Sequence, residues 1–539
     1  MPVIESKVDT EAKSFVDNRA TMLEKIDEVQ GLETRIAEHS ARAKPKFVER
    51  GQLLPRERLA LLLDRDKPFV PISSLAGYKM HDDDGDATIS GGGQIAGIGS
   101  VAGTHCLVVA SDSGIKGGAL SQGGVKKVIR CHAIARENKL PMVNLVESAG
   151  ANLLRQADIF VMGGRTFCNQ ARLSSAGIPQ ITVVHGSSTA GGAYLPGMSD
   201  YTIVVRDRAK IFLAGPPLTK SALGEDATDE ELGGAVLHAT VTGLAEYLAE
   251  DDAHALAIAR DVVAGLDWNG SLPPRPVADY AEPLYPIDDV LGIVIVDYRK
   301  PYEARELIAR LVDGSEFLDF KPLYGIQTVC GTASIEGWRC AIIANNGPIT
   351  PQGSVKAAQF IQLCCQANTP IVYLHNTTGY MVGKDAEAGG AVKHGSKMIQ
   401  AVANASVPQL TLHIGASFGA GNYGMCGREY DPRFLFAWPN YRIAVMGGEH
   451  AAGVMKIVET AKYKRRGGPV PTKQIQDMHD GIVAAIEEES KALYATARLW
   501  DDGIIDPRDS RRLFGYLLGL CWEAEHRELR PNSYGVARG

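Results

Sequence analysis

Short apolar runs alternate with helical patterns along most of the chain. The runs HCLVVASD (105–112), LPMVNLVES (140–148) and PQITVVHG (179–186) are mostly apolar, whereas VKKVIRCHAIARENK (125–139) has its apolar residues at helical spacing. Strands that are apolar on both faces and are separated by helices are typical of a parallel sheet covered on both sides. The pattern therefore predicts an α/β fold.

The same pattern occurs twice. AGIPQITVVHGSSTAGGAY (176–194) resembles ASVPQLTLHIGASFGAGNY (405–423), and ENKLPMVNLVESAGA (137–151) resembles QANTPIVYLHNTTGY (366–380). In both pairs the second segment follows the first by 229 residues. Two upstream blocks match in the same order, 56–78 with 304–325 and 97–114 with 331–347. Four ordered matches predict two homologous halves.

A proline-rich stretch, DWNGSLPPRPVADYAEPLYP (267–286), marks the boundary between the halves. We therefore expect one domain over 48–272 and a second over 273–539. Residues 1–47 are predicted to form a charged helical segment that packs on the body or on another subunit. Its apolar positions have helical spacing and are Met22, Leu23, Ile26, Val29, Leu32 and Ile36.

Composition excludes several classes of protein. Of 539 residues, 45% are hydrophobic and 22% are charged, which is the composition of a globular chain rather than a disordered, collagenous or coiled-coil one. The formal net charge of −7 is spread without long blocks of one sign, so neither a nucleic-acid nor a membrane partner is expected.

The nine cysteines are odd in number and form no C-x-x-C pair, which argues against a disulfide scaffold and a zinc ribbon. No metal site is predicted. The first residues, MPVIESKVDTEAKSF, lack the apolar core of a signal peptide, and no run reaches the ~18 apolar residues of a membrane span. A cytoplasmic location is expected.

Glycine-rich turns follow the predicted strands in both halves. They lie at 115–124, 147–151 and 188–194 in the first half and at 345–353, 376–380 and 415–423 in the second. Small residues let the backbone approach a ligand and expose N–H groups that suit an oxyanion. Close packing of strand against helix is the alternative for any single turn. Because the same turn recurs at the same place in both halves, the pattern favours an anion-binding function.

Other motifs are weaker. Gly415-Ala416-Ser417-Phe418-Gly419 matches a hydrolase nucleophile elbow with Asp431 and His450 downstream, but its counterpart at 186–190 lacks the final glycine. Lys456 follows a methionine, as in a biotin-acceptor site, yet it lies in a helical pattern, so this chain is not expected to be biotinylated. His185, His394 and His413 are interpreted as core residues. Either phosphate binding or an exposed helix face explains the cations Lys116, Lys126, Lys127 and Arg130.

Several segments resemble the carboxyltransferase (beta) subunits of biotin-dependent acyl-CoA carboxylases, and the resemblance covers nearly the whole chain. They are RGQLLPRERLALLLD (50–64), SDYTIVV (199–205) and GPPLTKSALGE (215–225). Within that family, four segments resemble the 3-methylcrotonyl-CoA carboxylase branch: IFLAGPPL (211–218), FIQLCCQ (360–366), YMVGKDAEAGGAVKHGSKM (380–398) and FGAGNYGMCGR (418–428).

The resemblance implies two tandem crotonase-like (ClpP/crotonase) domains, the first binding acyl-CoA and the second carboxybiotin. It implies a biotinylated alpha subunit that contains the biotin carboxylase and the carrier, and that uses ATP and bicarbonate. It also implies a beta hexamer in an alpha6beta6 complex, with each active site shared between the N-terminal domain of one subunit and the C-terminal domain of another. The expected reaction is carboxylation of 3-methylcrotonyl-CoA in leucine degradation.

In this chemistry, negative charge develops on the thioester oxygen and on the biotin ureido oxygen, so two oxyanion holes replace a side-chain base. By resemblance, Gly191 and Gly192 hold the first oxygen, and Ala420 and Gly421 hold the second. Residues expected to bind the substrate are Gly117, Gly118, Ala193, Tyr194 and Tyr423.

Three segments depart from the methylcrotonyl pattern. Ser187-Ser188-Thr189 replaces a Cys-Thr pair, LPGMSDY (195–201) replaces VPAMADE, and ESAGANLLRQ (147–156) replaces DSGGANLPRQ. These segments border the expected acyl pocket, so geranyl-, propionyl- and long-chain acyl-CoA remain alternatives. Tyr423 and residues 195–198 are expected to shape the choice. A biotin-dependent decarboxylase subunit and a non-enzymatic assembly subunit are the other hypotheses.

Overall fold

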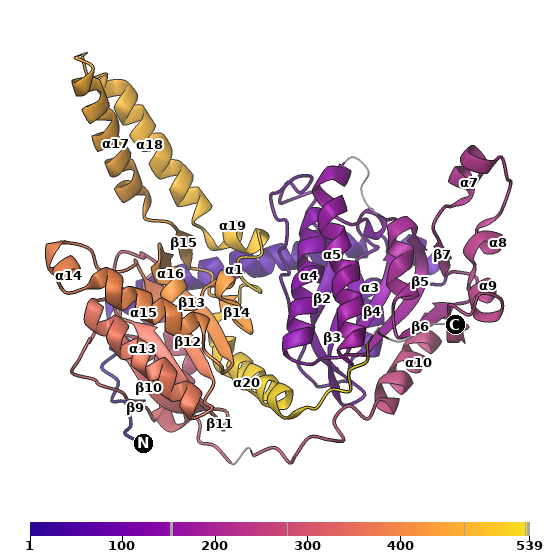
Figure 1. Ribbon diagram of the computed structural model, residues 1–539, viewed down its shortest axis with the longest axis horizontal. Coiled ribbons are helices and arrows are strands. Elements are labelled where there is room, and N and C mark those ends of the chain that lie inside the picture. Colours follow the sequence, from indigo (N-terminus) through magenta and orange to yellow (C-terminus); the bar gives the residue numbers. More distant parts are fainter. Residues whose placement is uncertain (151–154, 277–278, 468, 534, 536–539) are drawn as a thin grey trace. The chain divides into compact units, whose positions relative to one another are not determined.

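The computed structural model describes residues 1–150, 155–276, 279–467, 469–533 and 535. The chain divides into two compact units (Figure 1). The N-terminal unit consists of Gly31–Pro274, Ala497–Leu499 and Leu520–Gly539. The C-terminal unit consists of Met1–Gln30, Arg275–Thr496 and Trp500–Gly519. Each unit combines one mixed sheet with helices, which confirms the predicted α/β class.

The N-terminal unit is built on an eight-stranded sheet in the order β1-β2-β3-β4-β5-β6-β8, with β7 paired to the end of β5. Strands β1 to β3 are antiparallel, and pairing from β3 onward is parallel. The strands are β1 (Val70–Pro71), β2 (Gln94–Val101), β3 (Thr104–Ser111), β4 (Met142–Ser148), β5 (Gln180–Thr189), β6 (Tyr201–Val205), β7 (Lys210–Phe212) and β8 (Tyr247–Ala249).

Helices cover both faces of this sheet, and its strands are accordingly mostly apolar and buried. Val108, Val143 and Val183 pack against Leu62 and Leu256 in one buried cluster. The helices are α2 (Lys44–Glu49), α3 (Pro55–Leu62), α4 (Gln122–Glu137), α5 (Gln156–Ser175), α6 (Tyr194–Gly197), α7 (Pro216–Leu223), α8 (Asp229–Gly233), α9 (Ala235–Thr240) and α10 (Asp252–Gly265).

The C-terminal unit is built on a seven-stranded sheet in the order β14-β13-β12-β11-β10-β9, with β15 paired to the end of β13. Its strands are β9 (Leu318–Asp319), β10 (Thr328–Ile335), β11 (Trp338–Asn345), β12 (Ile371–Thr377), β13 (Gln409–Phe418), β14 (Phe434–Ala437) and β15 (Arg442–Ala444). Its helices are α11 (Val290–Ile293), α12 (Ala304–Leu311), α13 (Pro351–Gln366), α14 (Lys384–Ala388), α15 (Ala391–Ala403), α16 (Gly421–Gly424), α17 (Gly448–Arg465), α18 (Thr472–Glu489) and α19 (Ala492–Ala497).

The predicted repeat is present element by element. Strands β4 and β5 begin 229 residues before β12 and β13, and α4 begins 229 residues before α13. Both long helices have a hydroxyl N-cap, since Ser121 accepts from the Gly124 amide and Thr350 accepts from the Gly353 amide. Both sheets also show a register shift at the same place, before Ser148 in β4 and before Thr377 in β12.

Helix α1 (Lys13–Ala41) confirms the predicted amphipathic segment, and helix α20 (Ser510–His526) closes the chain. Both contribute residues to the two units. Five of the six apolar positions predicted for α1 are buried, Met22, Ile26, Val29, Leu32 and Ile36, while Leu23 is half-buried. All nine cysteines are free. None of the described helices is both long enough and apolar enough to cross a bilayer.

Candidate active site

The predicted oxyanion residues lie on two turns, one in each unit, at equivalent positions. In the N-terminal unit, β5 ends at Thr189, and a 3₁₀ turn η4 (Ala190–Ala193) leads into α6. In the C-terminal unit, β13 ends at Phe418, and Gly419 and Ala420 lead into α16. The first residue after each strand has a left-handed conformation, with φ of 52° at Ala190 and 55° at Gly419. Each turn therefore reverses the chain directly at the end of a buried strand.

The predicted oxyanion residues of the N-terminal unit lie in η4. Gly191 is exposed, and a Cβ placed on it would meet no atom within 4 Å. The Ser188 hydroxyl donates to the Gly192 carbonyl at 3.0 Å and fixes the orientation of that peptide. Because N–H groups in the first turn of a helix have no partner within the helix, the Gly191 and Gly192 amides are suited to an anion.

The equivalent residues of the C-terminal unit are more tightly packed. A Cβ on Gly421 would lie 2.9 Å from both the Gly379 Cα and the Thr377 Cγ2, so only glycine fits there. The Gly419 amide donates to the Ala444 carbonyl at 3.0 Å, which ties the turn to β15. The Asn422 amide group donates to Ser417 Oγ at 2.8 Å. Ala420 immediately precedes α16 and Gly421 is its first residue, and these positions are equivalent to Gly191 and Gly192 in η4.

A second pair of equivalent turns supports the first. Ser148 Oγ donates to the Gly118 carbonyl at 2.7 Å and accepts from the Gly150 amide at 3.1 Å. In the C-terminal unit, Thr377 Oγ1 donates to the Gly347 carbonyl at 3.1 Å and accepts from the Gly379 amide at 3.3 Å. The hydroxyl at the end of β4 or β12 thus fixes the glycine loop that follows the neighbouring strand.

Gly118 is confined by the backbone. Its φ is 71°, and a Cβ on it would lie 2.3 Å from the Glu147 carbonyl oxygen, so a side chain does not fit. Gly117, the other predicted substrate-binding glycine, lines a cavity of about 410 Å³ within the N-terminal unit. The rest of its lining includes Ser148 and Ser187.

Three cations line the same cavity. Lys46 and Arg50 are exposed at the α2 side, and Lys116 lies on the loop that carries Gly117. Lys116 Nζ is 2.5 Å from Asp82 Oδ2, and this hydrogen bond lowers the pKa of Asp82. Lysine and arginine side chains around a cavity favour phosphate groups. The cavity therefore has the charge expected for the phosphate-bearing part of a substrate.

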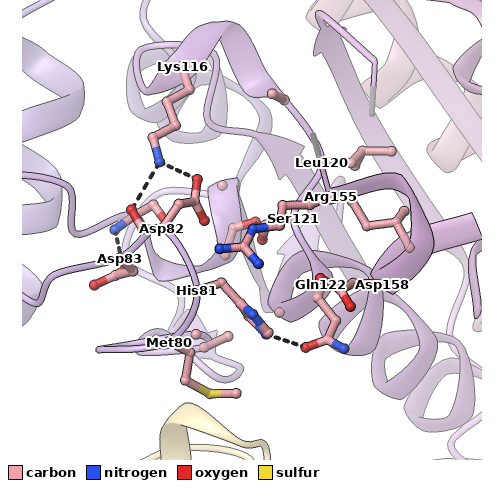
Figure 2. Close-up of a pocket in the computed structure, with 18 of the residues that line it drawn as sticks. Met80, His81, Asp82, Asp83, Lys116, Leu120, Ser121, Gln122, Arg155 and Asp158 are labelled. Carbon is pink, nitrogen blue, oxygen red and sulfur yellow. Dashed lines mark hydrogen bonds and ion pairs between the residues drawn. The ribbon is translucent and has the colours of Figure 1, made fainter. Parts of the chain in front are cut away.

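Lys116 also lines a smaller pocket, which is drawn in Figure 2. Figure 2 shows Lys116 bonded to Asp82 and the ring of His81 bonded to Gln122, with His81 Nε2 2.6 Å from Gln122 Oε1. Arg155 and Asp158, at the start of α5, complete the charged lining. Ala151 and the other residues at 151–154, which belong to the segment ESAGANLLRQ, lie outside the described residues.

A buried charged network lies behind the cavity. Arg58 Nη1 is 2.6 Å from Glu147 Oε2, and Arg58 Nε is 3.1 Å from Asp252 Oδ2. His185 Nδ1 is 2.8 Å from Asp252 Oδ1. Burial and the Arg58 charge lower the pKa of His185. Although burial opposes it, hydrogen bonding from His185 and the charge of Arg58 hold the pKa of Asp252 at about 2.

The network joins four distant parts of the chain and places Glu147 at the cavity wall. Arg58 belongs to α3, Glu147 to β4, His185 to β5 and Asp252 to α10. Glu147 also accepts from Ser113 Oγ at 2.9 Å and from Gln52 Nε2 at 3.2 Å. This cluster was not predicted from the sequence. PRERL lies in a segment that resembles the family and ESAGA was interpreted as a glycine-rich turn, but spacing alone does not pair their charges.

Two equivalent tyrosines flank the turns. Tyr194 is 49% exposed and Tyr423 is 47% exposed. Tyr194 makes an edge contact with Phe167 of α5 at 5.9 Å, and Tyr423 stacks on Tyr430 at 5.8 Å. Ala193 is buried beneath the first turn. The exposed phenol rings are therefore available to a ligand at each turn.

The weaker motifs find structural explanations. Ser417 is fully buried inside β13 rather than raised on an elbow, and Lys456 lies on the exposed side of α17. Lys127 is buried and donates to the carbonyls of Gly91 and Gln94, so it does not face a phosphate. His185 and His413 are buried core residues, as predicted, whereas His394 is half-buried.

Comparison with known proteins identifies the family. The carboxyl transferase domain model matches residues 46–533. A probable biotin-dependent acyl-coenzyme A carboxylase beta2 subunit of Mycobacterium tuberculosis is 48% identical, with 97% of each chain covered. A probable methylcrotonoyl-CoA carboxylase beta chain of Drosophila melanogaster is 45% identical, with 99% of this chain and 95% of the relative covered.

A solved structure matches along the full length. The crystal structure of the P. aeruginosa geranyl-CoA carboxylase beta subunit superimposes with a TM-score of 0.94 at 58% identity, covering 100% of both chains. These comparisons confirm the family that the sequence motifs resemble. The chain belongs to the carboxyl transferase domain family and is the carboxyltransferase (beta) component of a biotin-dependent acyl-CoA carboxylase.

Proposed function

We propose that this chain transfers CO₂ from carboxybiotin to a 3-methyl-2-enoyl-CoA, and that geranyl-CoA is preferred to 3-methylcrotonyl-CoA. The observation that carries the reaction is the pair of equivalent turns, one after β5 and one after β13. Each places two consecutive backbone amides at a helix start directly after a residue of left-handed conformation. Two developing oxyanions require two such sites.

The N-terminal turn binds the thioester. The Gly191 and Gly192 amides hold the thioester oxygen, and they bind it more strongly as negative charge develops on it. The Ser188 hydroxyl donates to the Gly192 carbonyl at 3.0 Å and so holds the end of this turn in place. Lys46, Arg50 and Lys116 bind the CoA phosphates, and Gly117 lets the chain of the ligand lie against the backbone, while Gly118, which is buried, supports the loop from behind.

The C-terminal turn binds biotin. The group is carried by the partner subunit and supplies the CO₂ together with a nitrogen that accepts the substrate proton. The residues present fit it, because Ala420 is exposed, and neither it nor Gly421 carries a side chain long enough to block the two amides. The Ala420 and Gly421 amides hold the ureido oxygen, and Tyr423 flanks the ring. Because backbone amides hold both oxygens and the biotin nitrogen accepts the proton, no side-chain base is needed.

The substrate preference rests on room beside the first turn. Gly163 and Gly164 lie one helical turn before Phe167 on α5 and so on the face that reaches Tyr194. A Cβ placed on either glycine would meet no atom within 4 Å. Phe160 and Val161, on the same helix, are 77% and 83% exposed. This open apolar surface accommodates the additional isoprene unit of a geranyl chain.

Similarity supports the same preference. The geranyl-CoA carboxylase beta subunit is 58% identical over the whole chain, against 45% for the methylcrotonoyl-CoA carboxylase beta chain of Drosophila melanogaster. The three departures noted in the sequence lie at 147–156, 187–189 and 195–201, and the last two flank the N-terminal turn. The expected 3-methylcrotonyl-CoA therefore becomes the second candidate substrate.

The complete enzyme requires a biotinylated alpha subunit, which uses ATP and bicarbonate to carboxylate its own biotin. We propose a beta hexamer within an alpha6beta6 complex, with each active site formed by the N-terminal unit of one copy and the C-terminal unit of another. The nine free cysteines support a reducing compartment. The compartment expected from the sequence is the cytoplasm.

The test is fixation of labelled bicarbonate by the complex of this chain with its biotinylated partner. Geranyl-, 3-methylcrotonyl-, propionyl-, acetyl- and long-chain acyl-CoA are compared by kcat/KM. We expect the highest value for geranyl-CoA and a lower one for 3-methylcrotonyl-CoA. A preference for 3-methylcrotonyl-CoA overturns the substrate proposal, and fixation into none of them overturns the reaction.

A further inference from the structure

In each unit, a short strand pairs beside the turn, and the chain leaves this strand as a separate segment. Strand β7 pairs with the last residues of β5, with Thr189 opposite Phe212, and β15 pairs with the last residues of β13, with Phe418 opposite Ala444. The N-terminal unit continues into α7 and α8, and the C-terminal unit into the long hairpin of α17 and α18 (Figure 1). We call residues 213–231 the N-terminal arm and residues 445–489 the hairpin.

Both segments expose large apolar side chains that none of the described residues covers. In the N-terminal arm they are Leu213, Leu218 and Leu223, exposed by 58%, 58% and 75%. In the hairpin they are Val445, Val454, Met455, Ile457 and Val458, exposed by 42–79%. The hairpin residues 454, 457 and 458 share one face of α17. Apolar surface of this kind marks a protein contact.

The two segments carry opposite charge. The loop after α7 and the first turn of α8, here together called the acidic loop, expose Glu225, Asp226, Asp229, Glu230 and Glu231. The end of α17, here the basic tip, consists of Lys462, Lys464, Arg465 and Arg466. Surfaces of opposite sign attract and exclude wrong partners.

Much of this charge is unpaired within the chain. Among the described residues, Lys464, Arg465 and Arg466 have no ion-pair partner, and neither do Glu225 and Asp229. Lys462 pairs with its neighbour Glu459 at 3.0 Å, Asp226 pairs with Lys220 at 2.6 Å, and Glu230 pairs with Lys210. The remaining like charges in each cluster repel one another, so a partner of opposite charge would stabilise them.

We propose that the basic tip of one copy binds the acidic loop of a second copy, while the exposed face of α17 packs on α7. The inference rests on the proposed function, which forms each site from two copies. Both segments begin beside a turn, since Leu213 follows β7 and Val445 follows β15. If the two turns face each other across a subunit boundary, the segments that leave them meet there as well. The N-terminal arm of one copy and the hairpin of the other then hold the two copies together around the shared site.

The first test is a cross-link between copies in the full complex. Two versions of the full chain are co-produced with the alpha subunit, one carrying Arg465→Cys and the other Asp229→Cys. Both also carry Cys168→Ser and Cys365→Ser, because these are the cysteines that are not buried. A short bis-maleimide is expected to link the two versions. Replacing Asp229→Cys by Lys67→Cys, on an exposed loop of the same unit, gives the matched control and is expected to stay unlinked.

The second test exchanges the charges. The variant Lys464→Glu/Arg465→Glu is expected to raise the dissociation constant between copies by about 100-fold at 0.1 M salt, because like charges then face each other. Adding Glu225→Lys/Asp229→Lys in the same chain is expected to restore association. Arg65→Glu/Lys67→Glu makes the same change in net charge elsewhere and is expected to leave association unchanged. Restored association also shows that the first variant folds.

The outcomes separate this proposal from the proposed function. Absence of the Arg465–Asp229 cross-link in an assembled complex overturns the proposed contact between the basic tip and the acidic loop. The proposal is also overturned if Lys464→Glu/Arg465→Glu weakens association and adding Glu225→Lys/Asp229→Lys does not restore it, because the basic tip then binds another surface. Both results leave bicarbonate fixation by the wild-type complex intact. Failure of the proposed function, in contrast, is seen as absence of fixation in the wild type.

Discussion

Ala190 and Gly419 occupy equivalent positions in the two units and share a left-handed backbone conformation, with φ of 52° and 55°. Alanine is strained in this region by roughly 1 kcal/mol, whereas glycine adopts it freely. The conformation is nevertheless present in both units. In each unit it lies between a buried strand and a short helical turn.

Ala190 and Gly419 are expected to respond differently to substitution. Ala190→Gly removes the strain and is expected to leave kcat/KM within about twofold of wild type, with a change in unfolding free energy below about 1 kcal/mol. Gly419→Ala adds strain and places a Cβ 3.1 Å from the Val445 carbonyl oxygen, so we expect lower activity and stability. Steady-state fixation assays and urea unfolding check both. Equal effects of the two substitutions would contradict the interpretation of the turns.

The buried network predicts loss of stability in acid. His185 and Asp252 have lowered pKa values, from usual values of 6.5 and 3.8, so the unfolded chain binds more protons at low pH. The contribution of His185 is therefore fully present above pH 6.5 and is lost as pH falls below it. That of Asp252 is lost between pH 3.8 and about 2.

His185→Asn keeps a donor for Asp252 but does not titrate. The difference in unfolding free energy between wild type and variant is expected to change below pH 6.5, by up to about 1.4 kcal/mol per pH unit. Thermal or urea unfolding from pH 5 to 8 measures it. A difference that is independent of pH would show that the pKa of His185 is the same in the folded and the unfolded chain, and would contradict this prediction.

The cations around the larger cavity predict a phosphate-dependent effect. Lys46→Ala/Arg50→Ala is expected to raise KM for acyl-CoA about tenfold with little change in kcat, because both side chains line the cavity but lie outside the turns. The corresponding N-acetylcysteamine thioester lacks the CoA phosphates and provides the control. Its KM is expected to be unchanged, and a parallel rise would mean that the substitutions disturb the fold.

The open surface on α5 predicts a switch in substrate choice. Gly163→Leu places a side chain next to Phe167 and is expected to lower kcat/KM for geranyl-CoA at least tenfold. Activity with 3-methylcrotonyl-CoA, which has no second isoprene unit, is expected to change less than threefold. If both substrates lose activity equally, the long chain does not lie along this face.

The repeat made much of this fold predictable. Strands β4 and β5 and helix α4 recur as β12, β13 and α13 because the same apolar runs, hydroxyl N-caps and glycines occur in both halves. Gly191, Gly192 and Gly421 could be placed on turns for the same reason. The pairing of Arg58 with Glu147 and Asp252 could not, because the three residues lie far apart in sequence and meet only when the sheet is covered. The charge of Lys127 was also misleading, since backbone carbonyls bind it in the interior.

The most direct test of the two-turn account uses the subunit with free biotin as acceptor, so that no partner is needed. Release of labelled carboxyl from the carboxylated acyl-CoA is measured for wild type, Gly421→Ala and the control Ala420→Gly, together with acyl-CoA affinity. A Cβ at Gly421 must displace the turn, because it would lie 2.9 Å from Gly379. We predict that Gly421→Ala lowers kcat about 100-fold or more while acyl-CoA binds with unchanged affinity. Wild-type turnover by Gly421→Ala would contradict the account.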